Sequence, residues 1–95
     1  MAGRRSKHET AILVARRSNG TEVERHEMAL EDYYQNLHEM IDSATYRATH
    51  GIAVIEGQLV DQDGRLFQEF QNRYGADGTY EGGRTTHADG TINED

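Results

Sequence analysis

The 95 residues of this chain, 35% of them hydrophobic, can fill one small core, which excludes a second domain. The absence of cysteine excludes disulfides and thiolate metal sites, and it favours an intracellular protein. The formal net charge of −7 opposes nucleic-acid binding over most of the surface and favours a basic partner.

Residues 1–9, MAGRRSKHE, show no apolar periodicity and are predicted to form a flexible basic tail. Together with Arg16 and Arg17 they bring five basic residues against Glu9 alone, whereas the rest of the chain is acidic. No apolar run here or later approaches the roughly 20 residues of a membrane span. We therefore expect a soluble, cytoplasmic protein that does not contact a membrane.

Residues 10–28, TAILVARRSNGTEVERHEM, predict a β-hairpin. The pair Asn19-Gly20 between two runs of β-forming residues is typical of a type I′ turn. In the second run only Val23 and Met28 are strongly apolar, which indicates an edge strand whose charged side chains oppose pairing with other chains.

Residues 30–50 predict one long amphipathic helix, and Gly51 is well placed to end it. At about 100° per residue the apolar positions share an arc of about 120°, which is the width of a face that packs on a sheet. This predicted core face consists of Leu30, Tyr33, Tyr34, Leu37, Met40, Ile41, Ala44 and Ala48.

The opposite side of this helix is predicted to be the binding surface. Tyr46 lies there among four carboxylates within an arc of about 100°, and no cation on that side balances them. A tyrosine supplies apolar area and a hydroxyl at small entropic cost, so we expect it to anchor a partner rich in arginine and lysine. The predicted partner-binding residues are Glu31, Asp32, Gln35, Glu39, Asp42 and Tyr46.

Residues 52–74 predict a second hairpin around the Asp-Gly pair of DQDG. Its second run, residues 65–74, also carries apolar residues at helical spacing, so a short helix ending at Gly75 is the alternative. We favour the strand because it would satisfy the backbone of the preceding apolar run.

The end of the chain carries the sequence ADGT twice, at 76–79 and at 88–91. The first copy predicts a turn into a short strand, TYEG. Residues 83–95 are polar and have little to bury, so we expect them to form a frayed tail.

The chain offers no motif for metal, cofactor or catalysis. DQDG begins like a calcium loop, but Arg65 falls on a ligand position. No two histidines have the spacing of a zinc-protease helix, and no nucleophile motif is present. We therefore expect a non-enzymatic protein without metal or cofactor. The histidines considered are His8, His26, His38, His50 and His87.

These elements predict an α+β fold in which one amphipathic helix packs across a small antiparallel sheet, in the order β-β-α-β-β with a further short strand as an option. The single domain is expected to span residues 10–82. In size, charge and predicted architecture the chain resembles the small phage-encoded inhibitors of bacterial defence, the anti-CRISPR and anti-restriction proteins. The resemblance implies a stoichiometric inhibitor, acting in the cytoplasm of a bacterial host, that docks its acidic helix face on a basic, nucleic-acid-handling surface of a nuclease or CRISPR effector complex.

Two alternatives stay open. A weak nucleic-acid binder would act through Arg4, Arg5, Arg16 and Arg17, against the repulsion of the acidic domain. A small structural or regulatory homodimer would form through the edge strand TEVERHEM and so complete a thin core.

Overall fold

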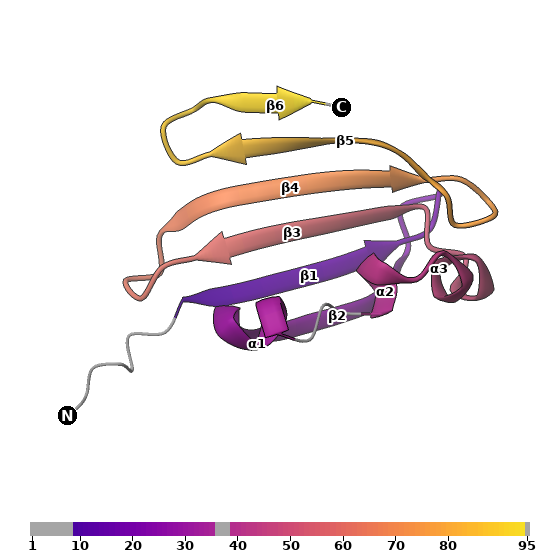
Figure 1. Ribbon diagram of the computed structural model, residues 1–95, viewed down its shortest axis with the longest axis horizontal. Helices are drawn as coiled ribbons and strands as arrows, with labels where there is room; N and C mark the ends of the chain where they lie inside the picture. Colours follow the sequence, from indigo (N-terminus) through magenta and orange to yellow (C-terminus); the bar gives the residue numbers. More distant parts are fainter. Residues whose placement is uncertain (1–8, 36–38, 95) are drawn as a thin grey trace.

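A computed structural model describes residues 9–35 and 39–94, with the side chains of residues 34, 35 and 39 outside the description. Six strands form one sheet in the order β2-β1-β3-β4-β5-β6, and every neighbouring pair is antiparallel (Figure 1). The strands are β1 (Thr10–Arg16), β2 (Glu22–Ala29), β3 (Val54–Val60), β4 (Leu66–Tyr74), β5 (Tyr80–His87) and β6 (Ile92–Glu94).

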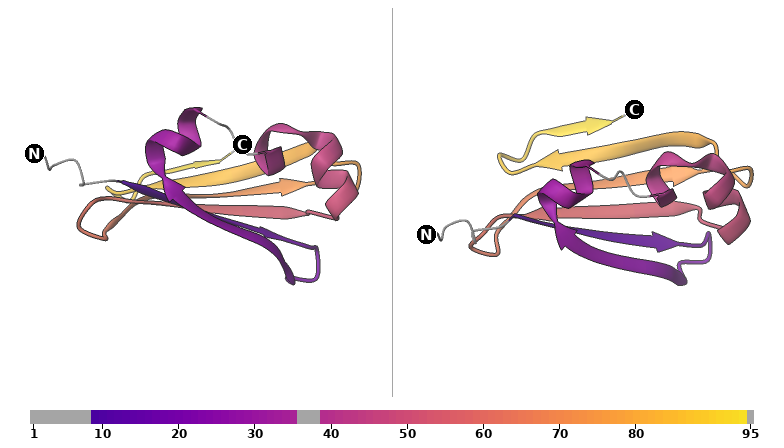
Figure 2. Two further views of the ribbon diagram at one scale, coloured as in Figure 1. Left: turned by 90° about the horizontal axis from the view of Figure 1, so that it is seen from below. Right: turned by 60° about the horizontal axis from the view of Figure 1, so that its bottom comes forward.

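The predicted fold class is wrong, because this sheet dominates the molecule. The described helical part consists of three short helices in place of one long helix packed on a small sheet. All three stand on the same side of the sheet, over its β2, β1 and β3 half (Figure 2). The helices are α1 (Leu30–Gln35), α2 (Glu39–Asp42) and α3 (Ala44–His50).

A backbone break at Ser43 divides the predicted helix. Ser43 is extended, with φ −123° and ψ 113°, and its hydroxyl accepts the N–H of Tyr46 at 3.1 Å. Serine is favoured here because its oxygen satisfies an N–H in the first turn that has no acceptor within the helix. Gly51 ends α3 in the left-handed conformation with φ 69°, which confirms the predicted terminator.

The first hairpin is confirmed, but its turn is not type I′. Gly20 N–H donates to Arg17 O at 2.9 Å, and Arg17 N–H donates to Thr21 O at 2.9 Å. Positive φ occurs at Gly20 and not at Asn19, so this is a type I turn followed by a glycine bulge. The same bond pattern closes the turns of 61–65, 75–79 and 87–91.

The second hairpin is also confirmed, since residues 66–74 form β4 and pair with β3 along their length. The alternative helix is therefore excluded. The expectation of a frayed tail at 83–95 is wrong for the described residues. Residue 83 lies within β5, and β6 pairs with β5, with Arg84 opposite Glu94. These polar residues join the sheet because backbone pairing and the second ADGT turn need no apolar side chains.

The core lies between the helices and strands β2, β1 and β3. Alternate residues of β1 and β3 point toward the helices, where Leu13 and Ile55 are fully buried. Full burial of each such side chain contributes about 1.5–3 kcal/mol. The main cluster contains Leu13, Ala15, Met40, Ile52, Ile55 and Tyr74, and a second cluster contains Ala11, Leu30 and Leu59.

Candidate functional site

The predicted acidic helix face is not one surface in the structure. Glu31 and Asp32 lie in α1, Asp42 ends α2, and Tyr46 lies in α3. The extended backbone at Ser43 separates α3, and with it Tyr46, from the arc of α2 that carries Asp42. Glu31, Asp32 and Asp42 are exposed, as the prediction required, whereas the side chains of Gln35 and Glu39 lie outside the described residues.

Tyr46 ties α3 to the edge of the sheet. Its hydroxyl donates to Glu24 Oε2 of β2 at 2.6 Å, and its half-buried ring stacks on His50 with 4.0 Å between ring centroids. It also packs against the main core cluster. The expected exposure of Tyr46 is therefore wrong, because the residue is half-buried and its hydroxyl is bonded to Glu24, while its role in binding a partner stays a prediction.

Glu24 accepts hydrogen bonds from both Tyr46 and His26. Partial burial raises the pKa of its carboxyl, but hydrogen bonds from His26, at 2.9 Å, and from Tyr46 favour the charged form. The charges of His26 and His50 act in the same direction, and the pKa is lowered overall. The lowered pKa keeps Glu24 ionised at neutral pH, where it accepts the bonds from Tyr46 and His26.

The helix-free side of the sheet has a groove of about 360 Å³, with Ile12 and Val14 among the residues that line it. Its arginines are neutralised within the protein: Arg16 pairs with Glu56 at 2.9 Å. Arg25 pairs with Glu22, and Arg84 pairs with Glu94. A ligand would have to displace these pairs. The predicted nucleic-acid arginines Arg4 and Arg5 lie outside the described residues.

A different surface stands out on the side of the sheet that carries the helices. No described helix covers β4, β5 and β6 there (Figure 1). Phe67 and Phe70 are half-buried at its boundary with the core, and Tyr80 is 44% exposed. We call this surface the aromatic shelf, and it comprises Phe67, Phe70, Asn72, Tyr80, Thr85 and His87.

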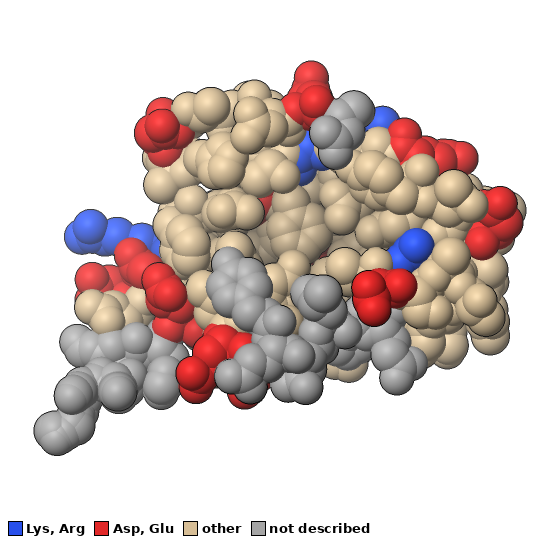
Figure 3. All heavy atoms as spheres, viewed as in Figure 1, with Lys and Arg blue, Asp and Glu red and all other residues tan. Residues whose placement is uncertain are grey.

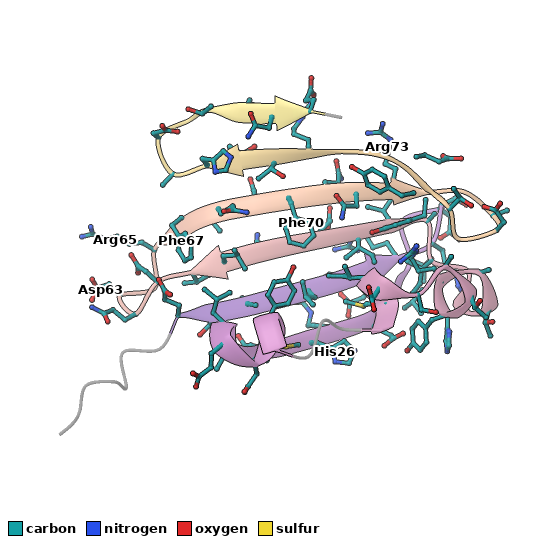
Figure 4. The ribbon with its side chains drawn as sticks, in the orientation of Figure 1. His26, Asp63, Arg65, Phe67, Phe70 and Arg73 are labelled. Carbon is teal, nitrogen blue, oxygen red and sulfur yellow. The ribbon has the colours of Figure 1, made fainter. Side chains whose placement is uncertain are left out.

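Strand register assembles the shelf. Phe70 of β4 stands opposite Thr85 of β5, and Asn72 stands opposite Gly83. The Phe70 ring points over the sheet toward β3, as Figure 4 shows. There it occupies the space above Gly57, because any Cβ at that position would overlap the ring.

Gly83 has the same role on β5. A Cβ there would lie 2.9 Å from the Tyr80 hydroxyl oxygen and 2.5 Å from Asn72 Oδ1. The Tyr80 ring also meets Tyr74 edge to face, with 5.9 Å between centroids. Both glycines are therefore required for the aromatic and amide side chains to settle against the sheet.

The shelf carries no Asp, Glu, Lys or Arg. Successive residues of a strand point to opposite faces, so the register places Glu69, Arg73 and Arg84 on the helix-free side. In Figure 3, uncharged side chains fill the middle of the helix-bearing face, which is hollowed there, and most Asp and Glu lie around its outline. An uncharged aromatic surface on a protein of net charge −7 is a local exception to its composition.

The sequence of β4 contains a signal for this surface. In FQEFQNRY, the charged residues Glu69 and Arg73 are an even number of positions apart, and the uncharged residues Phe70 and Asn72 occupy the alternate positions. This is a period-two pattern. The alternation predicts two different faces. Only the register shows that the uncharged face is the one beside the helices.

Neither a metal centre nor a membrane helix is found in the described part of the chain. No three His, Asp or Glu residues there are grouped so that they could hold a metal ion. No helix within 9–35 and 39–94 has the length and apolar character needed to cross a bilayer. Comparisons with protein-family models, with curated proteins and with solved structures found no match.

Proposed function

We propose that the protein is a non-enzymatic binding protein that docks a partner protein on the aromatic shelf. The observation that carries this proposal is the separation of side chains on β4 and β5. Aromatic, amide and hydroxyl groups occupy the helix-bearing side, and Glu69, Arg73 and Arg84 occupy the other. Phe67 and Phe70 also pack against the core clusters, whereas Asn72, Tyr80, Thr85 and His87 belong to neither cluster.

The composition of the shelf suits a protein interface. The centres of interfaces are depleted of charged residues and enriched in aromatic ones, and tyrosine is frequent among the residues that contribute most to affinity. Tyr80, which is 44% exposed, supplies aromatic area, and Phe67 and Phe70 supply half-buried apolar area. Asn72 supplies its amide, whose nitrogen donates to the Tyr74 hydroxyl at 3.3 Å.

The net charge favours a partner with a basic surface. Glu31, Asp32 and Asp42 are exposed on helices that stand on the same side of the sheet as the shelf. They would steer a basic partner toward it and form part of the polar rim. Enzymes that handle nucleic acids have such surfaces. As the specific form of this proposal, the protein is a stoichiometric inhibitor of an enzyme of this kind in the cytoplasm of a bacterial host.

Two neighbouring threonines give a matched pair of variants. Thr85 faces the shelf and Thr86 faces the opposite side, and both are half-buried residues of β5. Thr85→Arg and Thr86→Arg therefore change the charge and the strand in the same way on different faces. Tagged wild-type protein and both variants would be purified from the native host, and the proteins that co-purify would be quantified by mass spectrometry.

The partner is expected to be captured by the wild type and by T86R, and to be lost by at least tenfold with T85R, since burial of an unpaired charge at an interface costs more than the roughly 1.4 kcal/mol of a tenfold change. Circular dichroism of both variants would establish that the sheet is retained. Equal capture by the two variants, or loss with T86R alone, would exclude the shelf as the interface.

A further inference from the structure

The turn between β1 and β2 places an asparagine directly before a glycine at an exposed tip. Asn19 and Gly20 are both exposed, and a Cβ at Gly20 would meet no heavy atom within 4 Å. The backbone nitrogen that follows an asparagine is a potential nucleophile toward the side-chain amide carbon. A glycine leaves this nitrogen unshielded, because it has no side chain.

The hydrogen bonding of the turn prepares the amide for this attack. Thr21 N–H donates to Asn19 Oδ1 at 2.9 Å. This bond holds the Asn19 side chain against the backbone of the turn, in which Gly20 stands between the two bonded residues. It also polarises the carbonyl whose oxygen gains negative charge when the carbon is attacked.

The structure already contains two turns that resemble the product. Asp77 and Asp89 occupy the position of Asn19 in their turns, and each accepts the N–H of the threonine two residues later, at 3.0 Å and 2.9 Å. Hydrogen bonds to these threonines lower the pKa of both carboxyls. A carboxylate at position 19 would find the same donor in Thr21.

Positive charge beside the turn between β1 and β2 would stabilise an aspartate at position 19. Arg16 and the exposed Arg17 precede the turn; Arg16 Nη1 donates to Gly20 O at 3.1 Å while its Nε pairs with Glu56. A new carboxylate would lie near these cations and add to a basic part of the chain. At most other positions of this acidic protein, a further negative charge would be repelled.

We propose that Asn19 deamidates spontaneously in the folded protein and that the hairpin retains the aspartate product. The Gly20 nitrogen bonds to Asn19 Cγ, the bond from Cγ to the amide nitrogen breaks, and ammonia leaves with the proton from Gly20. Water then opens the cyclic imide, giving aspartate or, by cleavage of the other imide bond, isoaspartate. No electrons are transferred to or from another molecule. Gly20 N–H must first release Arg17 O, so the tip opens before the reaction.

The chain contains its own control in Asn93, an exposed residue of β6 that is followed by Glu94. The folded full-length protein would be held in mildly alkaline buffer, and peptides would be separated and weighed by mass spectrometry over time. Replacement of the amide by a hydroxyl is expected at least roughly tenfold faster at Asn19 than at Asn93, because the unshielded nitrogen of Gly20 and the hydrogen bond from Thr21 both favour it. A parallel sample in urea measures the same reaction in the unfolded chain.

Equal rates at Asn19 and Asn93 in the folded protein would overturn the proposal, and so would conversion at Asn19 in urea alone. The retained product is tested separately with Asn19→Asp. This variant is expected to keep the circular dichroism of the sheet and to unfold at the same or a higher urea concentration. Loss of sheet structure in N19D would show that the hairpin does not accommodate the product.

Discussion

Arg47 is the one buried charged residue within the described chain. Its Nε donates to Gly78 O at 2.9 Å and its Nη1 to Ile41 O at 2.6 Å, and the guanidinium lies 4.2 Å from the centre of the Tyr74 ring. Carbonyl dipoles and an aromatic face stabilise the cation, and none of its contacts among the described side chains is a carboxylate. Arg47 thus connects α2 and α3 to the turn between β4 and β5.

Replacing Arg47 by Met should lower the free energy of unfolding by about 3 kcal/mol, because buried carbonyl oxygens lose a charged donor. Arg73→Met is the control, since Arg73 is exposed on β4, and it should change the stability by less than about 0.5 kcal/mol. Urea unfolding at neutral pH measures both. Similar losses in the two variants would mean that the buried contacts of Arg47 contribute little.

Glu24 makes the stability depend on pH. Its folded pKa is lowered from the ordinary value of 4.5, so its contribution is complete above that value and is lost as the pH falls through the lowered pKa. Glu24→Gln should therefore be less stable than the wild type at neutral pH, and the difference should vanish in acid. Urea unfolding across this range measures it. A difference that stays constant with pH would rule out a role for the carboxylate charge.

At the scale of the elements, local signals predicted more than periodicity did. The Asn-Gly and Asp-Gly pairs located both predicted hairpins, because a turn depends on a few adjacent residues. The helical periodicity of residues 30–50 indicates a helical region, and helices are found there. Periodicity cannot reveal one extended residue within such a region, and here that residue is Ser43. Ser43 is the local signal for the division, because serine is a favoured N-cap, and periodicity does not detect a cap inside an apolar pattern.

Ser43→Ala should lower the stability by about 1 kcal/mol, because the N–H of Tyr46 loses its acceptor. Ser43→Asp should retain most of the stability, since aspartate is also a good N-cap. Thermal unfolding followed by circular dichroism compares the two. If S43A is as stable as the wild type, the hydroxyl does not determine where α3 begins.

At the scale of the whole molecule, the sheet is wider than the helices that pack on it. The sequence indicates an acidic, single-domain protein, but the aromatic shelf depends on pairings between distant residues. Phe70 lies over Gly57 only in the observed register of β3 and β4, and a shift by one residue would turn it to the other face. The sequence alone therefore indicates a site only on the predicted helix, where neighbouring side chains follow from spacing.

The central claim is that the helix-bearing side of β4 and β5 contacts the partner, and site-specific photocrosslinking tests it most directly. A benzoylphenylalanine would replace Tyr80 on the shelf or, as the control, Arg84 on the opposite side of the same strand. After irradiation in host cells, a covalent adduct of one defined mass is predicted from position 80 and not from position 84. An adduct from position 84 alone, or none from position 80, would contradict the claim.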